Sequence, residues 1–154
     1  MLSIEKIIKH IRNREYMSGV QRDQLRIKST SEVFTPAELV QQILDQYPKE
    51  FFKDPIRTYM DNSCGDGEFL GEVLIRKIQN GIDFDTALST IYGVDLMKDN
   101  VDLCRERLLC GQEYLRHIVE KNIVCHDALT YDYSFNGTNK TDSEIRFDNL
   151  FEHD

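Results

Sequence analysis

The sequence predicts an α/β fold with a mainly parallel sheet of about four strands and an N-terminal helical arm. Three observations carry this prediction. After Pro55, short apolar runs typical of strands alternate with longer segments of helical periodicity. Such alternation favours parallel strands joined by right-handed crossover connections. The chain has 154 residues and 40% hydrophobic content, enough for one domain with a substantial core.

The first predicted element is a helix from Ser3 to about residue 17, inside a basic arm at residues 1–30. Isoleucines at positions 4, 7, 8 and 11 form one apolar stripe, and Ser3 is expected to cap the helix. Residues 1–28 carry seven Lys or Arg and three acidic residues, a local charge of +4, whereas the whole chain carries −8. The arm is either a surface that contacts phosphate or an acidic partner, or a solvated helix face.

The remaining elements belong to a predicted core at residues 31–154. Thr35 is expected to be the N-cap of a second helix, with Pro36 at its first helical position. Strands are then expected at 58–60, 90–94, 122–125 and 145–150, and helices at 68–79, 84–88 and 98–118, the last with a weak point at Gly111.

Composition excludes several classes of protein. No apolar run is long enough for a membrane helix, and the N-terminus is charged too early for a secretory signal, so a cytoplasmic protein is expected. The four cysteines lack CxxC spacing and the four histidines form no spaced cluster, so we expect reduced thiols and no metal site. The net charge of −8 argues against general nucleic-acid affinity.

A glycine-containing loop between the first strand and the helix at 68–79 is the first functional signal. Gly65 and Gly67 permit backbone angles closed to other residues and let a ligand approach the main chain. The helix that follows offers unpaired N–H groups at its N-terminus. Leu70 stands where a third glycine of GxGxxG would be, and no Lys-Ser/Thr pair follows, so a phosphate ligand is not favoured here.

Three of the predicted strands end in an aspartate. Asp95 is placed to accept both hydroxyls of a ribose, and Asp127 to accept from an exocyclic amine. Leu96 and Leu129 are placed to sandwich a flat ring, and Asp61 suits a cationic ammonium group. Each aspartate alone would more often be a cap or turn residue, but together they describe S-adenosylmethionine.

These segments resemble a known family, the amino-methylating DNA methyltransferases of the adenine-N6 type found in restriction–modification systems. Asp61 to Leu70 resembles the family's D-P-x-C-G-x-G-x-F-L, and Tyr92 to Asp95 resembles its second motif. Asn122 to Leu129 resembles N-I-x-x-G-D-x-L, and Phe34-Thr35-Pro36 resembles the motif that precedes the core. The resemblance covers roughly residues 30–150, with the motifs in matching order.

The resemblance implies a truncated Rossmann-like methyltransferase core with S-adenosylmethionine as its cofactor. Thr35 would touch the carboxylate end of the cofactor, and Asp61 would hold its amino-acid portion. Asp95 would take the ribose and Asp127 the adenine amine. The full set of expected cofactor-binding residues is Thr35, Asp61, Ser63, Cys64, Gly65, Gly67, Asp95, Leu96, Asp127 and Leu129.

The sequence departs from the family pattern in three places. Asn62 replaces a proline and His126 a glycine, and the catalytic motif [DNS]-P-P-[YFW] is missing, so no catalytic residue is assigned. We therefore expect a cofactor-binding domain that does not methylate DNA by itself. A second chain or a homodimer would complete the sheet, and DNA would be bound weakly or through a partner. The alternative is a non-catalytic regulatory or decoy module that binds a methyltransferase.

Overall fold

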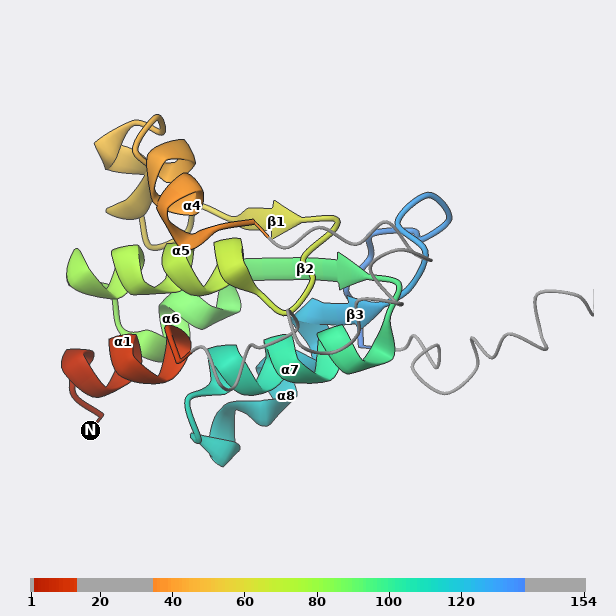
Figure 1. Cartoon of the computed structure of the whole chain (residues 1–154). Coiled ribbons are helices and arrows are strands. Elements are labelled where there is room, and N and C mark those ends of the chain that lie inside the picture. The colour runs from red at the N-terminus through yellow and green to blue at the C-terminus, as the bar shows by residue number, and fades with distance from the viewer. Residues whose placement is uncertain (1, 14–34, 138–154) are drawn as a thin grey trace, which may run out of the picture.

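The computed structural model describes residues 2–13 and 35–137, which form a mixed α/β fold with a small parallel sheet (Figure 1). The expected strand at 145–150, Phe34 and the arm beyond residue 13 lie outside these residues. The helices are α1 (Ile4–Ile11), α4 (Ala37–Leu44), α5 (Glu68–Gln79), α6 (Phe84–Ser89), α7 (Lys98–Leu109) and α8 (Arg116–Asn122). Two 3-10 turns, η1 (Lys49–Phe52) and η2 (Glu113–Leu115), and strands β1 (Tyr59–Asp61), β2 (Ile91–Asp95) and β3 (Ile123–Cys125) complete the described elements.

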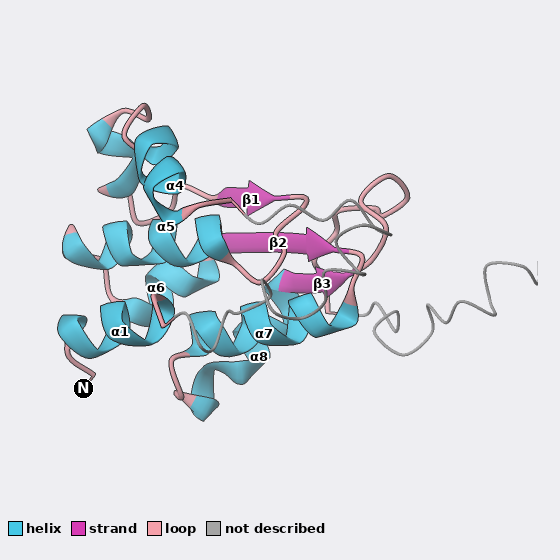
Figure 2. Cartoon of the chain, viewed as in Figure 1, coloured by secondary structure: helices cyan, strands magenta, loops and turns pink. Residues whose placement is uncertain are grey.

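The three strands run in the same direction in the order β1-β2-β3 (Figure 2). Tyr59 pairs with Ile91, and Gly93 pairs with Ile123. The predicted parallel α/β sheet is thus confirmed for its first three strands. Because the strands are parallel, their carboxyl ends lie along one edge of the sheet, where ligands bind in open α/β folds.

The two faces of the sheet are covered differently. Ile91 and Gly93 of β2 face the main core, which α5 and α7 contribute to, and Gly93 lies so close to α5 that a Cβ there would be 2.8 Å from Leu70 Cδ1. Val94 and Val124 instead pack with Tyr131 in a second, smaller cluster. The segment after β3 therefore covers the face opposite the helices with aromatic rings rather than with a helix.

The first helix packs onto the core. Ile7 and Ile11 of α1 are buried in the main cluster, and a Cβ at Gly71 of α5 would lie 2.6 Å from Ile11 Cγ2. Arg12 forms a two-pronged ion pair with Glu72, at 2.8 and 2.9 Å. Only a glycine in α5 allows α1 to approach this closely.

Several predicted boundaries were wrong. The helix at 3–17 ends at Ile11, although Ser3 does cap it by accepting from Lys6 N. The helix at 98–118 is broken after Leu109, because Cys110 and Gly111 both take left-handed backbone angles, with φ of 51° and 73°. The weak point expected at Gly111 is therefore a full interruption, followed by η2 and α8.

The described helices were compared with the length and hydrophobicity that a membrane-spanning helix needs. Each of them is too short or too polar to traverse a bilayer.

Candidate functional site

The glycine loop between β1 and α5 adopts the backbone angles that its sequence predicts. Gly65 and Gly67 have φ of +54° and +94°. Cys64 N donates to Val94 O at 3.0 Å, and Gly67 N donates to Cys64 O at 2.9 Å, so the loop folds back over β2. A Cβ at Gly67 would be 2.9 Å from the sulfur of Cys104 on α7. Gly67 is therefore required both by its φ and by the close approach of α7.

Asp95 connects this loop to the end of β2. Its Oδ1 accepts from Gly65 N at 3.2 Å, and its Oδ2 accepts from Met97 N at 3.1 Å and from Asn100 Nδ2 at 3.2 Å. A carboxylate has about four acceptor positions, so these three bonds leave about one on Oδ1. A ribose that used Asp95 through both hydroxyls would have to displace one of the present donors.

Asp61 ends β1 and is half-buried. Its Oδ1 accepts from Ser63 N at 3.0 Å. Burial raises the pKa of Asp61 above its ordinary value; the bond from Ser63 opposes this rise, and the nearby charge of Asp95 adds to it. The carboxylate of Asp61 is thus partly desolvated and would gain from a cationic partner.

The register of the sheet arranges the three aspartates along a diagonal. Asp61 pairs with Gly93, two residues before Asp95, and Asp95 pairs with Cys125, two residues before Asp127. Strands lie about 4.8 Å apart and two residues advance about 6.6 Å, so Asp61 and Asp95 are about 8 Å apart, and Asp127 follows just after the end of β3. This spacing fits an extended ligand better than a compact one.

The end of β3 is open. Asp127 is exposed, and its Oδ1 accepts from Leu129 N at 2.9 Å, which leaves Oδ2 for a ligand. His126 N donates to Asp95 O at 2.9 Å, so the ends of β2 and β3 run side by side. Leu96 is 57% exposed and Leu129 is 93% exposed. Two large apolar side chains therefore stand uncovered beside the polar strand ends.

Thr35 does not take the helix-capping role predicted from sequence. Pro36 is the N-cap residue of α4, which begins at Ala37, and no side chain caps that helix. The error has a simple cause, since the φ of Pro36 is helix-like while its ψ of 144° is extended. Within the described residues, no hydrogen bond joins Thr35 to the glycine loop, whereas Asp61, Ser63, Gly65 and Asp95 are linked by bonds to the loop itself.

A charged cluster that was not predicted from sequence lies behind the loop. Arg107 of α7 is only 1% exposed and pairs with Asp66 at 3.7 Å and with Glu68 at 3.4 Å. Burial raises the pKa of Glu68, and Arg107 counteracts this rise. The hydrocarbon part of Arg107 also lies 3.5 Å from where a Gly67 Cβ would be. Arg107 therefore supports the glycine loop from its buried side.

The cysteine in the loop is not suited to nucleophilic chemistry. Cys64 is buried, and its contact with the Cys104 thiol together with burial raises its pKa well above the ordinary value. The thiolate, which is the reactive form, is thus disfavoured. All four cysteines are free and buried. Among the described residues no group of three or more His, Cys, Asp or Glu side chains could hold a metal ion.

Comparison with known proteins gave no match, either to family models, to curated proteins or to solved structures.

Proposed function

We propose that this chain binds S-adenosylmethionine at the carboxyl ends of β1, β2 and β3, as a truncated Rossmann-like methyltransferase core. The observation that supports this most strongly is the diagonal of Asp61, Asp95 and Asp127 beside a glycine loop that is hydrogen-bonded to Asp95. S-adenosylmethionine is extended, with an ammonium group at one end, a ribose in the middle and an adenine amine at the other end. Its groups follow the same order as the three aspartates.

Each part of the site would contribute a different interaction. Asp61 would pair with the ammonium group, which would also offset the cost of its burial. The main chain at Ser63, Cys64, Gly65 and Gly67 would lie against the amino-acid portion. Asp95 would hold the ribose after one of its present donors is displaced. Asp127 would accept from the adenine amine, with Leu96 and Leu129 covering the ring; Thr35 enters only through the resemblance.

The resemblance to adenine-N6 DNA methyltransferases supports a role in DNA methylation. The cofactor supplies the methyl group when bound, and this chain would bind and orient it without forming a covalent bond. The 154 residues contain no Pro-Pro-aromatic motif to hold the target amine. We therefore propose that methyl transfer needs residues beyond these 154 to hold the target amine. Within the described residues, β1 and β3 each pair only with β2, which leaves sheet edges for a partner chain.

Titration calorimetry with S-adenosylmethionine tests the binding proposal. The variant Asp95→Ala is expected to weaken binding at least about tenfold, since it removes an acceptor used by the ribose. Asp102→Ala is the matched control, because Asp102 is an exposed aspartate on α7 that pairs with Lys98 and lies away from the strand ends. Equal binding by wild type and Asp95→Ala would remove Asp95 from the site, and no binding by wild type would reject the function.

A methyl-transfer assay separates the two roles considered from sequence. The isolated chain is expected to transfer no radiolabelled methyl group to adenine-containing DNA. A partner that restores transfer would support the methyltransferase component, and a partner methyltransferase that is inhibited would support the regulatory or decoy module. Transfer by the isolated chain would contradict the proposal that catalysis requires further residues.

A further inference from the structure

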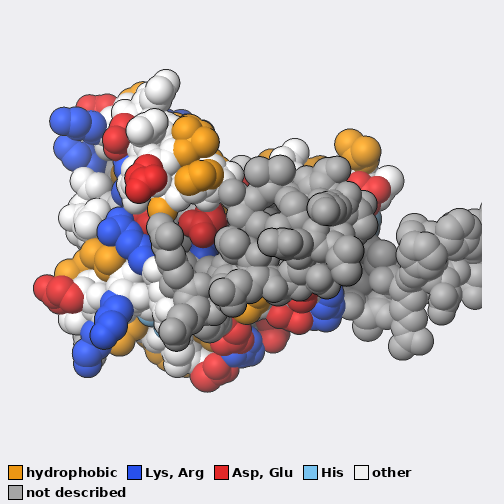
Figure 3. All heavy atoms as spheres, viewed as in Figure 1, with side chains coloured by type: hydrophobic (Ala, Val, Ile, Leu, Met, Phe, Trp, Pro, Cys, Tyr) orange, Lys and Arg blue, Asp and Glu red, His pale blue; other side chains and the backbone are white. Residues whose placement is uncertain are grey.

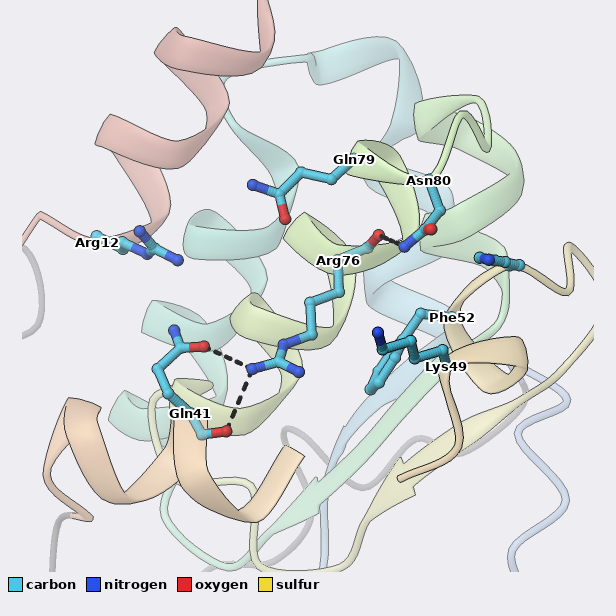
Figure 4. A pocket seen from close by; sticks show the side chains of 8 residues that line it. Arg12, Gln41, Lys49, Phe52, Arg76, Gln79 and Asn80 are labelled. Atoms are coloured by element: carbon cyan, nitrogen blue, oxygen red, sulfur yellow. Dashed lines mark hydrogen bonds between the residues drawn. The ribbon is translucent and has the colours of Figure 1, made fainter. Parts of the chain in front are cut away.

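A pocket of about 310 Å³ lies at the C-terminal end of α5, at the opposite end of that helix from the glycine loop (Figure 4). It is formed by segments far apart in the sequence. Arg12 comes from the end of α1, Gln41 from α4, and Arg76 from the last turn of α5. Lys49 and Phe52 come from η1, and Lys53 follows directly.

All four charged residues that line this pocket are basic. Arg12 is neutralised by Glu72, and Arg76 by Asp45 at 2.8 Å. Lys49 and Lys53 have no ion pair with any described residue, so the pocket carries an excess of two positive charges. Elsewhere on the face seen in Figure 3, acidic and basic side chains are interspersed. The positive charge of the pocket contrasts with the net charge of −8 of the whole chain.

A network of hydrogen bonds fixes the two arginines and leaves the lysines available. Arg76 donates to the main-chain and side-chain oxygens of Gln41, at 3.2 and 2.7 Å, and its guanidinium lies 5.4 Å from the centre of the Phe52 ring. Gln41 in turn donates to Glu72 at 2.6 Å. The arginines are thus committed to holding α1, α4 and α5 together, and the pocket is formed before any ligand arrives.

The end of α5 does not cancel this positive charge. A helix C-terminus carries a partial negative charge on its last carbonyls. Here Asn80 N and Asn80 Nδ2 donate to Arg76 O, and Ile82 N donates to Lys77 O. These carbonyls are therefore occupied by the chain itself, and Gln79 adds a neutral amide to the lining.

We propose that this pocket binds a small phosphate-bearing ligand, with the ammonium groups of Lys49 and Lys53 as its main contacts. An ammonium group acts as a point charge that suits phosphate, and two of them lining one pocket favour a ligand with more than one negative charge. A volume of about 310 Å³ is at the lower end for ligand pockets, which favours a ligand of the size of pyrophosphate over a polymer. This site is separate from the one proposed for S-adenosylmethionine.

Titration calorimetry of the whole chain with pyrophosphate, at fixed ionic strength, tests the proposal. The double variant Lys49→Gln, Lys53→Gln is expected to raise the dissociation constant at least about tenfold, because two charge-assisted contacts are lost. The matched control is Lys98→Gln, Lys121→Gln, which removes two exposed lysines from α7 and α8 and should change the constant by less than about twofold. Thermal unfolding verifies that both variants are folded.

The proposal is overturned if wild type does not bind pyrophosphate, or if the two double variants bind it equally well. It is also overturned if citrate binds as tightly as pyrophosphate, because this would reject phosphate as the chemical class. Pyrophosphate binding that survives saturation with S-adenosylmethionine would support two separate sites, and competition between the two ligands would contradict them. Failure at the glycine loop would leave this result unaffected.

Discussion

Charged side chains gather at both ends of α5, acidic ones in the chain at its N-terminal end and a basic one at its C-terminal end. The two groups have different roles. At the N-terminal end, Asp66 and Glu68 surround buried Arg107. At the C-terminal end, Arg76 pairs with exposed Asp45. Both arrangements agree with the helix dipole, so charge pattern alone does not distinguish them. Burial does: the first end is a fixed support for a loop, and the second is a solvent-accessible cationic pocket.

The largest expected effect comes from breaking the buried cluster. Arg107→Met should lower the free energy of unfolding by about 3 kcal/mol, because it leaves the buried carboxylate of Asp66 without its cation. Arg76→Met removes an arginine at the other end and should cost about 1 kcal/mol, since Asp45 stays in water. Denaturant unfolding measures both values. Equal losses would show that the two ends do not differ in the way burial indicates.

The next prediction concerns two glycines with nearly the same backbone angle. Gly67 and Gly81 have φ of +94° and +92°, but only at Gly67 would a Cβ meet a neighbour, the Cys104 sulfur. Gly81→Ala should cost about 1 kcal/mol from backbone strain alone. Gly67→Ala should cost about 2 kcal/mol more, because α7 must shift. Similar unfolding free energies would contradict the close contact between the glycine loop and α7.

The sequence predicts the elements around the loop far better than the contacts behind it. Helix α5 was expected at 68–79 and is found at Glu68–Gln79, because a glycine turn and Asn80-Gly81 mark both ends locally. The three described strands are within about one residue of expectation for the same reason. Arg107 and Lys77 instead look like ordinary polar helix positions, yet both are buried. Their burial depends on which helices pack together, which no local pattern encodes.

The candidate site also combines features that the local sequence predicts with features that depend on how the chain packs. The aspartates at the strand ends and the left-handed glycines could be placed because strand ends and turns have local signatures. The stagger of the aspartates depends on register, and the occupied acceptor positions of Asp95 depend on Asn100 and Met97 folding back toward it. The pocket at the other end of α5 escaped prediction altogether, because its lining comes from four segments that are unremarkable one by one.

The smallest expected effect compares two aspartates in the same local turn. Asp61 Oδ1 accepts from Ser63 N, and Asp132 Oδ1 accepts from Ser134 N, both at 3.0 Å. Burial raises the pKa of Asp61, whereas the bonds from Ser134 lower the pKa of exposed Asp132. The turn bond lowers the pKa of both aspartates, and at Asp61 the larger effect of desolvation reverses the net shift.

Opposite shifts give opposite dependences of stability on pH. With a raised pKa, folded Asp61 holds its proton more tightly than unfolded chain does, so its contribution to stability falls as pH rises from its ordinary pKa of about 3.9 through the raised value. Asp61→Asn should therefore raise Tm at pH 7, and this gain should shrink toward acid. Asp132→Asn should lower Tm slightly at pH 7, and the loss should also disappear in acid, as that carboxylate becomes protonated.

The same substitution at Asp61 should act on S-adenosylmethionine in the opposite sense to its effect on stability. An ammonium group needs the charged carboxylate, so binding by wild type should weaken as pH falls, starting at a higher pH than an ordinary aspartate would give. Asp61→Asn should bind more weakly at pH 7 and lose this acid-side dependence, while Asp132→Asn keeps it. A more stable Asp61→Asn protein that binds as well as wild type would mean that the burial of Asp61 serves packing and not the ligand.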